Sequence, residues 1–210
     1  MIKVFFLFFE PAVAWDKIAQ ARRGFSYILA TCVLPMLALM GLVNGWGLHK
    51  WGKWQPPFQR IKAFDDLPTV VGFECIEVVL MLAAIFVSAL LILRIAQTFH
   101  GRHTYLQAFT VAAYGLSPLL LLRLLDAAPS VSPWATWGVG VAISIWILYQ
   151  GMPRILQPDP THAFGLYLCT VTVIFLVTGL ARLFTGLFLL GYMDMNHSYL
   201  MRKVIQVFGH

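Results

Sequence analysis

The chain has 210 residues, of which 60% are hydrophobic and only 11% are charged, and its mean hydropathy is +0.77. Soluble domains are about half apolar, so this composition excludes a soluble enzyme or binding domain and indicates an integral membrane protein. The net charge of +6 does not indicate nucleic-acid binding, because the basic residues are scattered near the ends of apolar segments. Phospholipid headgroups are the anionic neighbours expected there.

The amino-terminal segment, residues 1–25, opens with a short apolar stretch and continues with apolar residues at helical spacing. The stretch is shorter than the core of a secretory signal peptide, so we expect the segment to be retained in the protein. A helix is predicted to start at Pro11 and to be amphipathic. Such a helix would lie in the membrane interface, with Trp15 at headgroup depth and Arg22 and Arg23 near lipid phosphates.

Five apolar segments follow, and each is long enough to cross a hydrocarbon core, which takes roughly 20 helical residues. Their limits are 26–48, 70–94, 104–125, 133–152 and 163–190. The one long connection, 49–69, is rich in tryptophan, proline and lysine, which is typical of a loop on the membrane surface. The predicted fold is therefore all-α: a polytopic membrane domain at 26–190, followed by a tail, 191–210, with a further interfacial helix.

The middle of the third segment reads Tyr114-Gly115-Leu116-Ser117-Pro118. Proline lacks an amide donor and its ring collides with the carbonyl four residues earlier, so Pro118 is predicted to break the helix and free the Tyr114 carbonyl. A neighbouring helix, the Ser117 hydroxyl or a water would have to satisfy that carbonyl within lipid. Gly115 leaves room for a neighbouring backbone, so we expect this segment to be the central helix.

Four short motifs of the chain resemble, in the same order, those of the Yip family of five-helix membrane proteins. They are Glu10-Pro11-Ala12-Val13-Ala14-Trp15, Gly101-Arg102-His103-Thr104-Tyr105, Tyr114-Gly115-Leu116-Ser117-Pro118 and Leu148-Tyr149-Gln150-Gly151-Met152-Pro153. The resemblance runs from about residue 9 to residue 190. It implies a multi-pass protein of the family's bacterial branch, located in the inner membrane. Eukaryotic members resemble Rab-binding adaptors with a long cytosolic region before the helices; only residues 1–25 precede them here, so GTPase binding is not expected.

Four charged residues lie within or at the ends of the apolar segments and are the candidate functional cluster: Glu74, Glu77, Arg123 and Arg182. The order of the segments places all four in the same half of the membrane, where an unpaired charge costs about 2.5 to 3.5 kcal/mol. One interpretation is a polar cavity in which the carboxylates take a proton or cation and the arginines bind a phosphate or carboxylate. The other is mutual neutralisation that fixes helix register. Depth along the helices predicts that Glu77 pairs with Arg182, with Glu74 as the alternative acid.

No cofactor or metal is expected from the sequence. His100 and His103 could supply two imidazoles, but no nearby cysteine or carboxylate completes a ligand set. Ser117 has no base within sequence-visible reach, and the chain has no phosphate-binding glycine loop, CxxC pair or HExxH motif, so we do not expect an enzyme.

Stripes of small residues predict close helix contacts, either within the bundle or in a homo-oligomer. They are Gly41 and Gly45 in the first segment, and Thr136, Gly140 and Ser144 in the fourth. Two functions follow from the sequence: a scaffold or adaptor that binds lipids or other membrane proteins, and a small transporter or channel that uses the charged residues. The absence of an inverted repeat favours the scaffold. Lysine and arginine are almost equally divided between the two sides, so they do not orient the protein.

Overall fold

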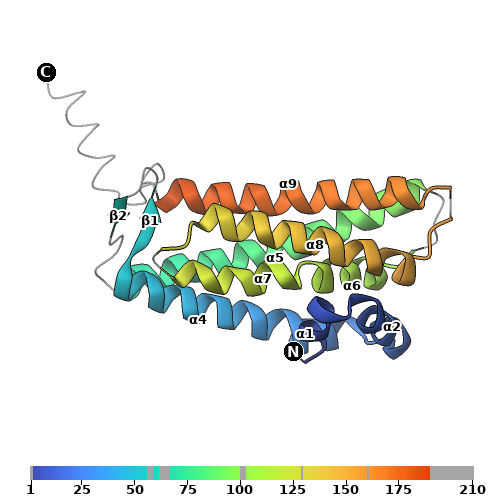
Figure 1. Ribbon diagram of the computed structural model, residues 1–210, viewed down its shortest axis with the longest axis horizontal. Helices are drawn as coiled ribbons and strands as arrows, with labels where there is room; N and C mark the ends of the chain where they lie inside the picture. The colour runs from blue at the N-terminus through green and yellow to red at the C-terminus, as the bar shows by residue number, and fades with distance from the viewer. Residues whose placement is uncertain are drawn as a thin grey trace, which may run out of the picture.

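The structure is a computed structural model that describes residues 2–55, 59–61, 67–99, 103–128, 130–159 and 161–189. Long helices lie side by side in a bundle, and two short amino-terminal helices pack against one of its ends (Figure 1). Within the described residues, five helical stretches are long and apolar enough to cross a membrane: Phe25–Trp51, Leu67–Thr98, Tyr105–Ala127, Pro133–Ile155 and Ala163–Leu187. The prediction of an all-α bundle with five spans is therefore confirmed.

The helices occur along the chain in the following order. The amino-terminal helices are α1 (Ile2–Phe9) and α2 (Pro11–Ala21). The first span consists of α3 (Phe25–Ile28), the π-helical turn η1 (Leu29–Val33) and α4 (Leu34–Trp51). The second span is α5 (Leu67–Thr98), and the third is α6 (Tyr105–Gly115), α7 (Ser117–Leu122) and the 3₁₀ turn η2 (Arg123–Ala127). The last two are α8 (Pro133–Ile155) and α9 (Ala163–Leu189).

The third span is broken where proline predicts a break. Helix α6 ends at Gly115 and α7 begins at Ser117. The Ser117 hydroxyl donates a hydrogen bond of 2.6 Å to the freed Tyr114 carbonyl, which is one of the three partners expected. This span is also the central one, because 78% of its membrane-crossing stretch is buried inside the protein, against at most 44% for the other four.

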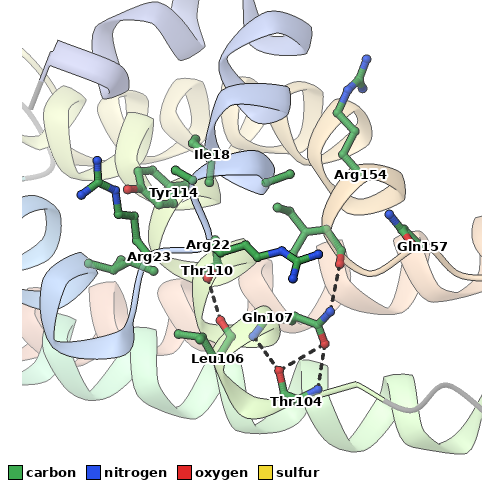
Figure 2. Close-up of a pocket in the computed structure, with 14 residues that line it drawn as sticks. Ile18, Arg22, Arg23, Thr104, Leu106, Gln107, Thr110, Tyr114, Arg154 and Gln157 are labelled. Carbon is green, nitrogen blue, oxygen red and sulfur yellow. Dashed lines mark hydrogen bonds between the residues drawn. The ribbon is translucent and has the colours of Figure 1, made fainter.

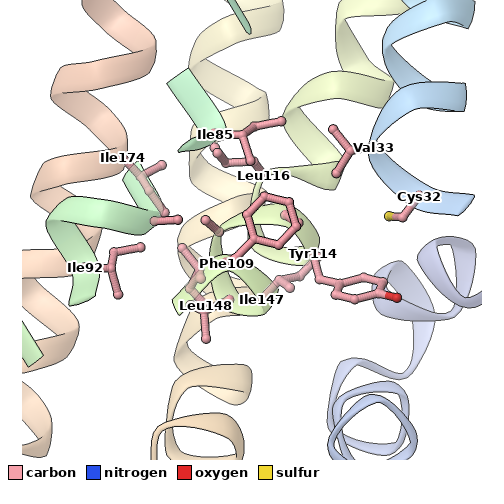
Figure 3. Close-up of a cluster of buried hydrophobic side chains, with 14 of the residues drawn as sticks. Cys32, Val33, Ile85, Ile92, Phe109, Tyr114, Leu116, Ile147, Leu148 and Ile174 are labelled. Carbon is pink, nitrogen blue, oxygen red and sulfur yellow. The ribbon is translucent and has the colours of Figure 1, made fainter. Parts of the chain in front are cut away.

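The apolar core gathers around α6 and the break (Figure 3). Phe109 on α6 is fully buried, and its ring lies 4.6 Å from that of Phe25 and 5.6 Å from that of Phe86. These rings join the first and second spans to the third. On the other side of α6, a Cβ placed on Gly115 would lie 2.4 Å from Cδ2 of Leu148, so α8 packs tightly against the end of α6.

Trp15 does not face lipid headgroups, although its predicted place on an interfacial helix implies that it does. Helix α2 is amphipathic as predicted, but Trp15 is fully buried and its indole nitrogen donates a hydrogen bond of 3.0 Å to the Ile147 carbonyl of α8. A Cβ on Gly151 would lie 2.2 Å from the indole, so this glycine opens the space that Trp15 fills. The apolar face of α2 therefore meets protein rather than lipid.

The small-residue stripes pack within the bundle. A Cβ on Gly41 would lie 3.0 Å from an α5 side chain, and one on Gly45 would lie 3.2 Å from another. On α8, a Cβ on Gly140 would lie 3.0 Å from the Cα of Leu119. These residues therefore set the spacing between neighbouring spans.

Part of the connection between the first two spans forms β-structure. Strands β1 (Lys53–Gln55) and β2 (Gln59–Ile61) pair in an antiparallel hairpin between α4 and α5. Residues 56–58 and 62–66 of the predicted surface loop lie outside the described residues, as do residues 190–210, which include the tail with its predicted interfacial helix.

The packing at Gly115 leads to a stability prediction. Gly115→Leu forces a side chain into the space occupied by Leu148 and should lower the free energy of unfolding in detergent by about 3 kcal/mol. The matched variant Leu121→Ala removes a half-buried side chain from the same span and should cost only about 1 kcal/mol. Thermal unfolding followed by circular dichroism measures both, and an equal or smaller loss for Gly115→Leu would show that the break is loosely packed.

Candidate functional site

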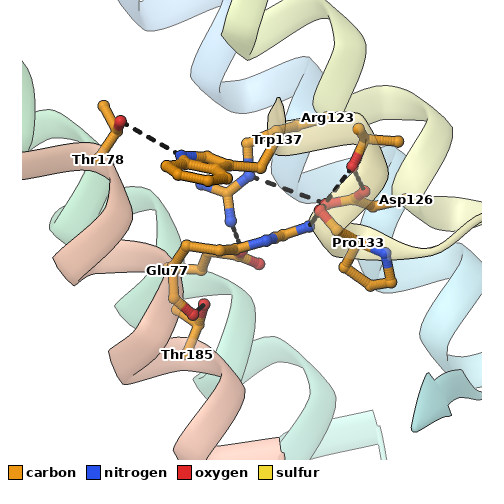
Figure 4. A network of polar contacts seen from close by, with 9 residues as sticks. Glu77, Arg123, Asp126, Pro133, Trp137, Thr178 and Thr185 are labelled. Atoms are coloured by element: carbon orange, nitrogen blue, oxygen red, sulfur yellow. Dashed lines mark hydrogen bonds and ion pairs between the residues drawn. The ribbon is translucent and has the colours of Figure 1, made fainter. Parts of the chain in front are cut away.

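The charged residues of three spans meet at the end of the bundle far from α1 and α2 (Figures 1 and 4). Glu77 comes from α5, Arg123 and Asp126 from η2, and Arg182 from α9. All four side chains are at most 5% exposed. We call these four residues the charge cluster.

Two close ion pairs make up the charge cluster. Arg123 donates a hydrogen bond from Nη2 to Oε1 of Glu77, and Nη2 of Arg182 lies 2.5 Å from Oδ2 of Asp126. Longer contacts cross between the pairs: Nη1 of Arg182 lies 3.7 Å from Glu77 Oε1, and Nε of Arg123 lies 3.9 Å from Asp126 Oδ2. Each carboxylate is thus shared by both arginines.

Helix α8 contributes neutral partners to the same cluster. The Thr136 hydroxyl donates a hydrogen bond to Asp126, and Nη2 of Arg182 donates one of 2.7 Å to the Pro133 carbonyl. Trp137 and Thr178 lie beside these groups, with the indole nitrogen 3.3 Å from the threonine hydroxyl (Figure 4). Four spans therefore meet at the charge cluster.

The predicted pairing of Glu77 with Arg182 is only partly right. The two side chains are in ionic contact, but the nearest partner of Glu77 is Arg123 and the nearest partner of Arg182 is Asp126. Asp126 was missed because the apolar run ends just before it, so that it looked like a loop residue. The 3₁₀ turn η2 continues the span by one turn and brings this carboxylate, three residues after Arg123, into the interior.

Glu74, the alternative acid, is also buried on α5, and its Cγ faces Gly45 of α4. The sequence predicted that it shares a half of the membrane with Glu77, and both lie near the start of the same helix. Glu77 is the residue of this pair that contacts both arginines of the charge cluster.

The charge cluster has two formal negative and two formal positive charges, so it is neutral when all four groups are ionised. Burial of any one charge without its partners would be expensive, whereas excellent geometry and additional hydrogen bonds offset the desolvation. This arrangement can fix the relative rotation of α5, α9 and the third span. It can also exchange a proton or cation only if one of these contacts opens.

Described residues of the four motifs that carry the family resemblance lie at the opposite end of the bundle. The Trp15 ring contacts the edge of the Tyr114 ring with centroids 6.1 Å apart, and the indole fills the space left by Gly151. Thr104 caps α6: its hydroxyl accepts from the backbone N–H of Gln107, and its own backbone N–H and hydroxyl both donate to the side-chain oxygen of Gln107. The Gln107 amide in turn donates to the Ile155 carbonyl at the end of α8. Three of the motifs thus contact one another, and Thr104 of the other is linked through Gln107 to the end of α8.

The histidine pair considered for a metal is not brought into a ligand set within the described part of the chain. No group of three or more histidine, cysteine, aspartate or glutamate side chains there could hold a metal ion. His103 precedes α6, where partial burial lowers the pKa of its imidazole, and His100 lies outside the described residues.

The charge cluster leads to a test of pairing. Glu77→Gln leaves Arg123 buried without its nearest carboxylate and should lower the free energy of unfolding by about 3 kcal/mol, because breaking a buried pair leaves an uncompensated charge. The double variant Glu77→Gln with Arg123→Met should recover at least about 1 kcal/mol of that loss. Chemical unfolding in detergent measures both, with the exposed Glu10→Gln as control. A double variant less stable than the single one would contradict the pairing.

Comparison with known proteins identifies the family. A family model described as the Yip1 domain matches residues 5–182, which include the four motifs, the broken third span and the charge cluster. No curated protein and no solved structure matches the chain. The match covers most of the 210 residues, and the chain therefore belongs to the Yip1 domain family of membrane proteins.

Proposed function

We propose that this multi-pass membrane protein is a non-enzymatic scaffold or adaptor of the bacterial inner membrane, which holds lipids or other membrane proteins against its helices. The observation that supports this proposal is the neutral charge cluster. Every charge in it faces an opposite charge at short range, so its contacts explain its burial without a transported solute. A cluster of this kind holds helices in register, which is the property that a scaffold needs.

The outer face of α9 offers a surface for such partners. Only 22% of its membrane-crossing stretch is buried, the lowest value among the five spans described. Its exposed face carries large apolar side chains: Leu168, Phe175, Leu176, Leu180, Leu183 and Phe184. Acyl chains or a helix of another membrane protein can pack against this face by van der Waals contact.

One observation favours a small transporter as the second candidate. Asn44 on α4 is only 2% exposed, and neither its amide nitrogen nor its oxygen has a hydrogen-bond partner within the described part of the chain. The hydroxyls of Ser88 on α5 and Ser144 on α8 are also buried without a hydrogen-bond partner within the described residues. Buried polar groups without partners are places where water or an ion can bind.

Flux measurements separate the two candidates. The scaffold predicts that proteoliposomes containing the protein leak protons and potassium no faster than empty vesicles, and that Glu77→Gln changes neither rate. A pH-sensitive dye and a potassium electrode provide the readouts. Proton or cation flux that the wild-type protein supports and Glu77→Gln abolishes would refute the scaffold and establish the transporter.

Crosslinking tests whether the outer face of α9 binds a partner. A photoreactive residue at Leu176, which is 54% exposed, should form discrete adducts with another membrane protein, a second copy of the chain or lipid. The same residue at Ile174, which is 1% exposed, should react only within the chain. Identical adducts from both positions would remove the evidence for a lateral binding face.

A further inference from the structure

A cavity of about 480 Å³ opens at the amino-terminal side of the bundle (Figure 2). Its walls come from four places: the end of α2 with the residues after it, α3, the face of α6 from Thr104 to Tyr114, and the end of α8 with the residues after it. Most of these are helix ends at the boundary of the hydrocarbon core, so the mouth of the cavity lies at the depth of lipid headgroups. Tyr114 lies deeper, beside the break in the third span.

The charged side chains that line the cavity are all basic. They are Arg22, Arg23 and Arg154. Arg154 is already engaged, because its Nε lies 2.8 Å from a carboxylate oxygen of Asp16 and its Nη1 donates to the Gln150 carbonyl. Arg22 and Arg23 have no carboxylate partner within the described part of the chain, so the cavity has two positive charges to offer an anion.

The backbone turns Arg22 over the cavity. This residue caps the C-terminus of α2 with φ 39° and ψ 48°, a left-handed conformation that helices usually assign to glycine. In Figure 2 its side chain extends across the cavity toward Gln107. A left-handed arginine at a binding cavity fits the tendency of backbone strain to occur at functional positions.

Two further groups can contribute donors. The guanidinium of Arg23 lies over the ring of Tyr27, with 4.3 Å from its central carbon to the ring centroid, which fixes the group while its N–H edge stays available. Tyr114 also lines the cavity, and Figure 2 draws its hydroxyl on the same side as Arg23, away from the guanidinium of Arg22. Guanidinium and hydroxyl groups are donors suited to phosphate oxygens.

The rest of the lining distinguishes a lipid from a soluble anion. Four apolar residues line the same cavity: Ile18, Ile28, Leu106 and Ile155. A small hydrated phosphate has no apolar groups to pack against these residues, whereas the glycerol and first methylenes of a lipid can pack against them. The combined lining therefore matches a ligand with an anionic head and an apolar body.

We propose that this cavity binds the headgroup of an anionic phospholipid between Arg22 on one side and Arg23 on the other, with the glycerol backbone against the apolar residues of its lining. The site deepens the proposed scaffold and rests on it, because it names one class of lipid that the scaffold would hold. Arg154 serves as a positioning residue, since its contact with Asp16 ties α2 to the end of α8.

Lipid retention by the full-length purified protein tests the site. The detergent-solubilised chain is titrated with dioleoylphosphatidylglycerol or dioleoylphosphatidylcholine, and native mass spectrometry counts the lipid bound. The wild-type protein should retain one phosphatidylglycerol in preference to phosphatidylcholine. Arg22→Gln with Arg23→Gln should weaken phosphatidylglycerol roughly 25-fold, about fivefold for each charge removed.

The matched control is Lys17→Gln with Arg94→Gln, which removes two exposed positive charges on the same side but outside the cavity. It should leave phosphatidylglycerol retention within about twofold of wild type. Circular dichroism and the unfolding temperature test whether both double variants are folded. We expect that they are, because all four substituted side chains are exposed.

Three results would overturn the site. These are an equal loss in the control, no loss in the arginine double variant, and displacement of the lipid by millimolar glycerol 3-phosphate or inorganic phosphate, which would identify a soluble phosphate as the ligand. Retention is measured on the isolated chain, whereas the scaffold is tested by flux and crosslinking in membranes. Failure of the lipid site can therefore be distinguished from failure of the scaffold.

Discussion

A charged side chain in an apolar bundle is stable only beside an opposite charge, and this constraint fixes how the second, third and fifth spans are arranged. Glu77, Arg123, Asp126 and Arg182 satisfy it together, since each carboxylate contacts both arginines. Rotation of any one helix would expose a charge to apolar surroundings. Because that exposure costs much free energy, the charge cluster fixes the rotation of these helices relative to one another. This role does not depend on the net free energy that the cluster contributes to folding.

At the opposite end of the bundle, side chains pack into the space left by glycines, and an ion pair between Arg154 and Asp16 joins α2 to α8. Trp15 fills the space beside Gly151, and Leu148 fills the space beside Gly115, so α2 and α8 both fit around the broken end of α6. The break itself costs little because the Ser117 hydroxyl satisfies the freed carbonyl. The arginine-lined cavity also opens at this end. The buried charge cluster and this cavity therefore lie at opposite ends of the bundle.

Features that depend on local chemistry were predictable from the sequence, and those that depend on helix rotation were not. Hydropathy and length give the five spans, and the stereochemistry of Pro118 gives the break together with the role of Ser117. Amphipathicity marked the apolar face of α2, but the same pattern suits lipid and protein partners, so the burial of Trp15 could not be foreseen. The carboxylate of Asp126 was missed because a single additional 3₁₀ turn decides whether it lies inside.

The structural role of the charge cluster requires that Glu77 is ionised and paired with arginine. Infrared difference spectroscopy of the carboxylic acid C=O stretch, compared between wild type and Glu77→Gln in lipid, measures that ionisation directly. If Glu77 is ionised and paired with Arg123, wild type shows no protonated carboxyl band that is missing from Glu77→Gln. A protonated carboxyl band that is present in wild type and disappears in Glu77→Gln would show instead that Glu77 is neutral and free to exchange a proton.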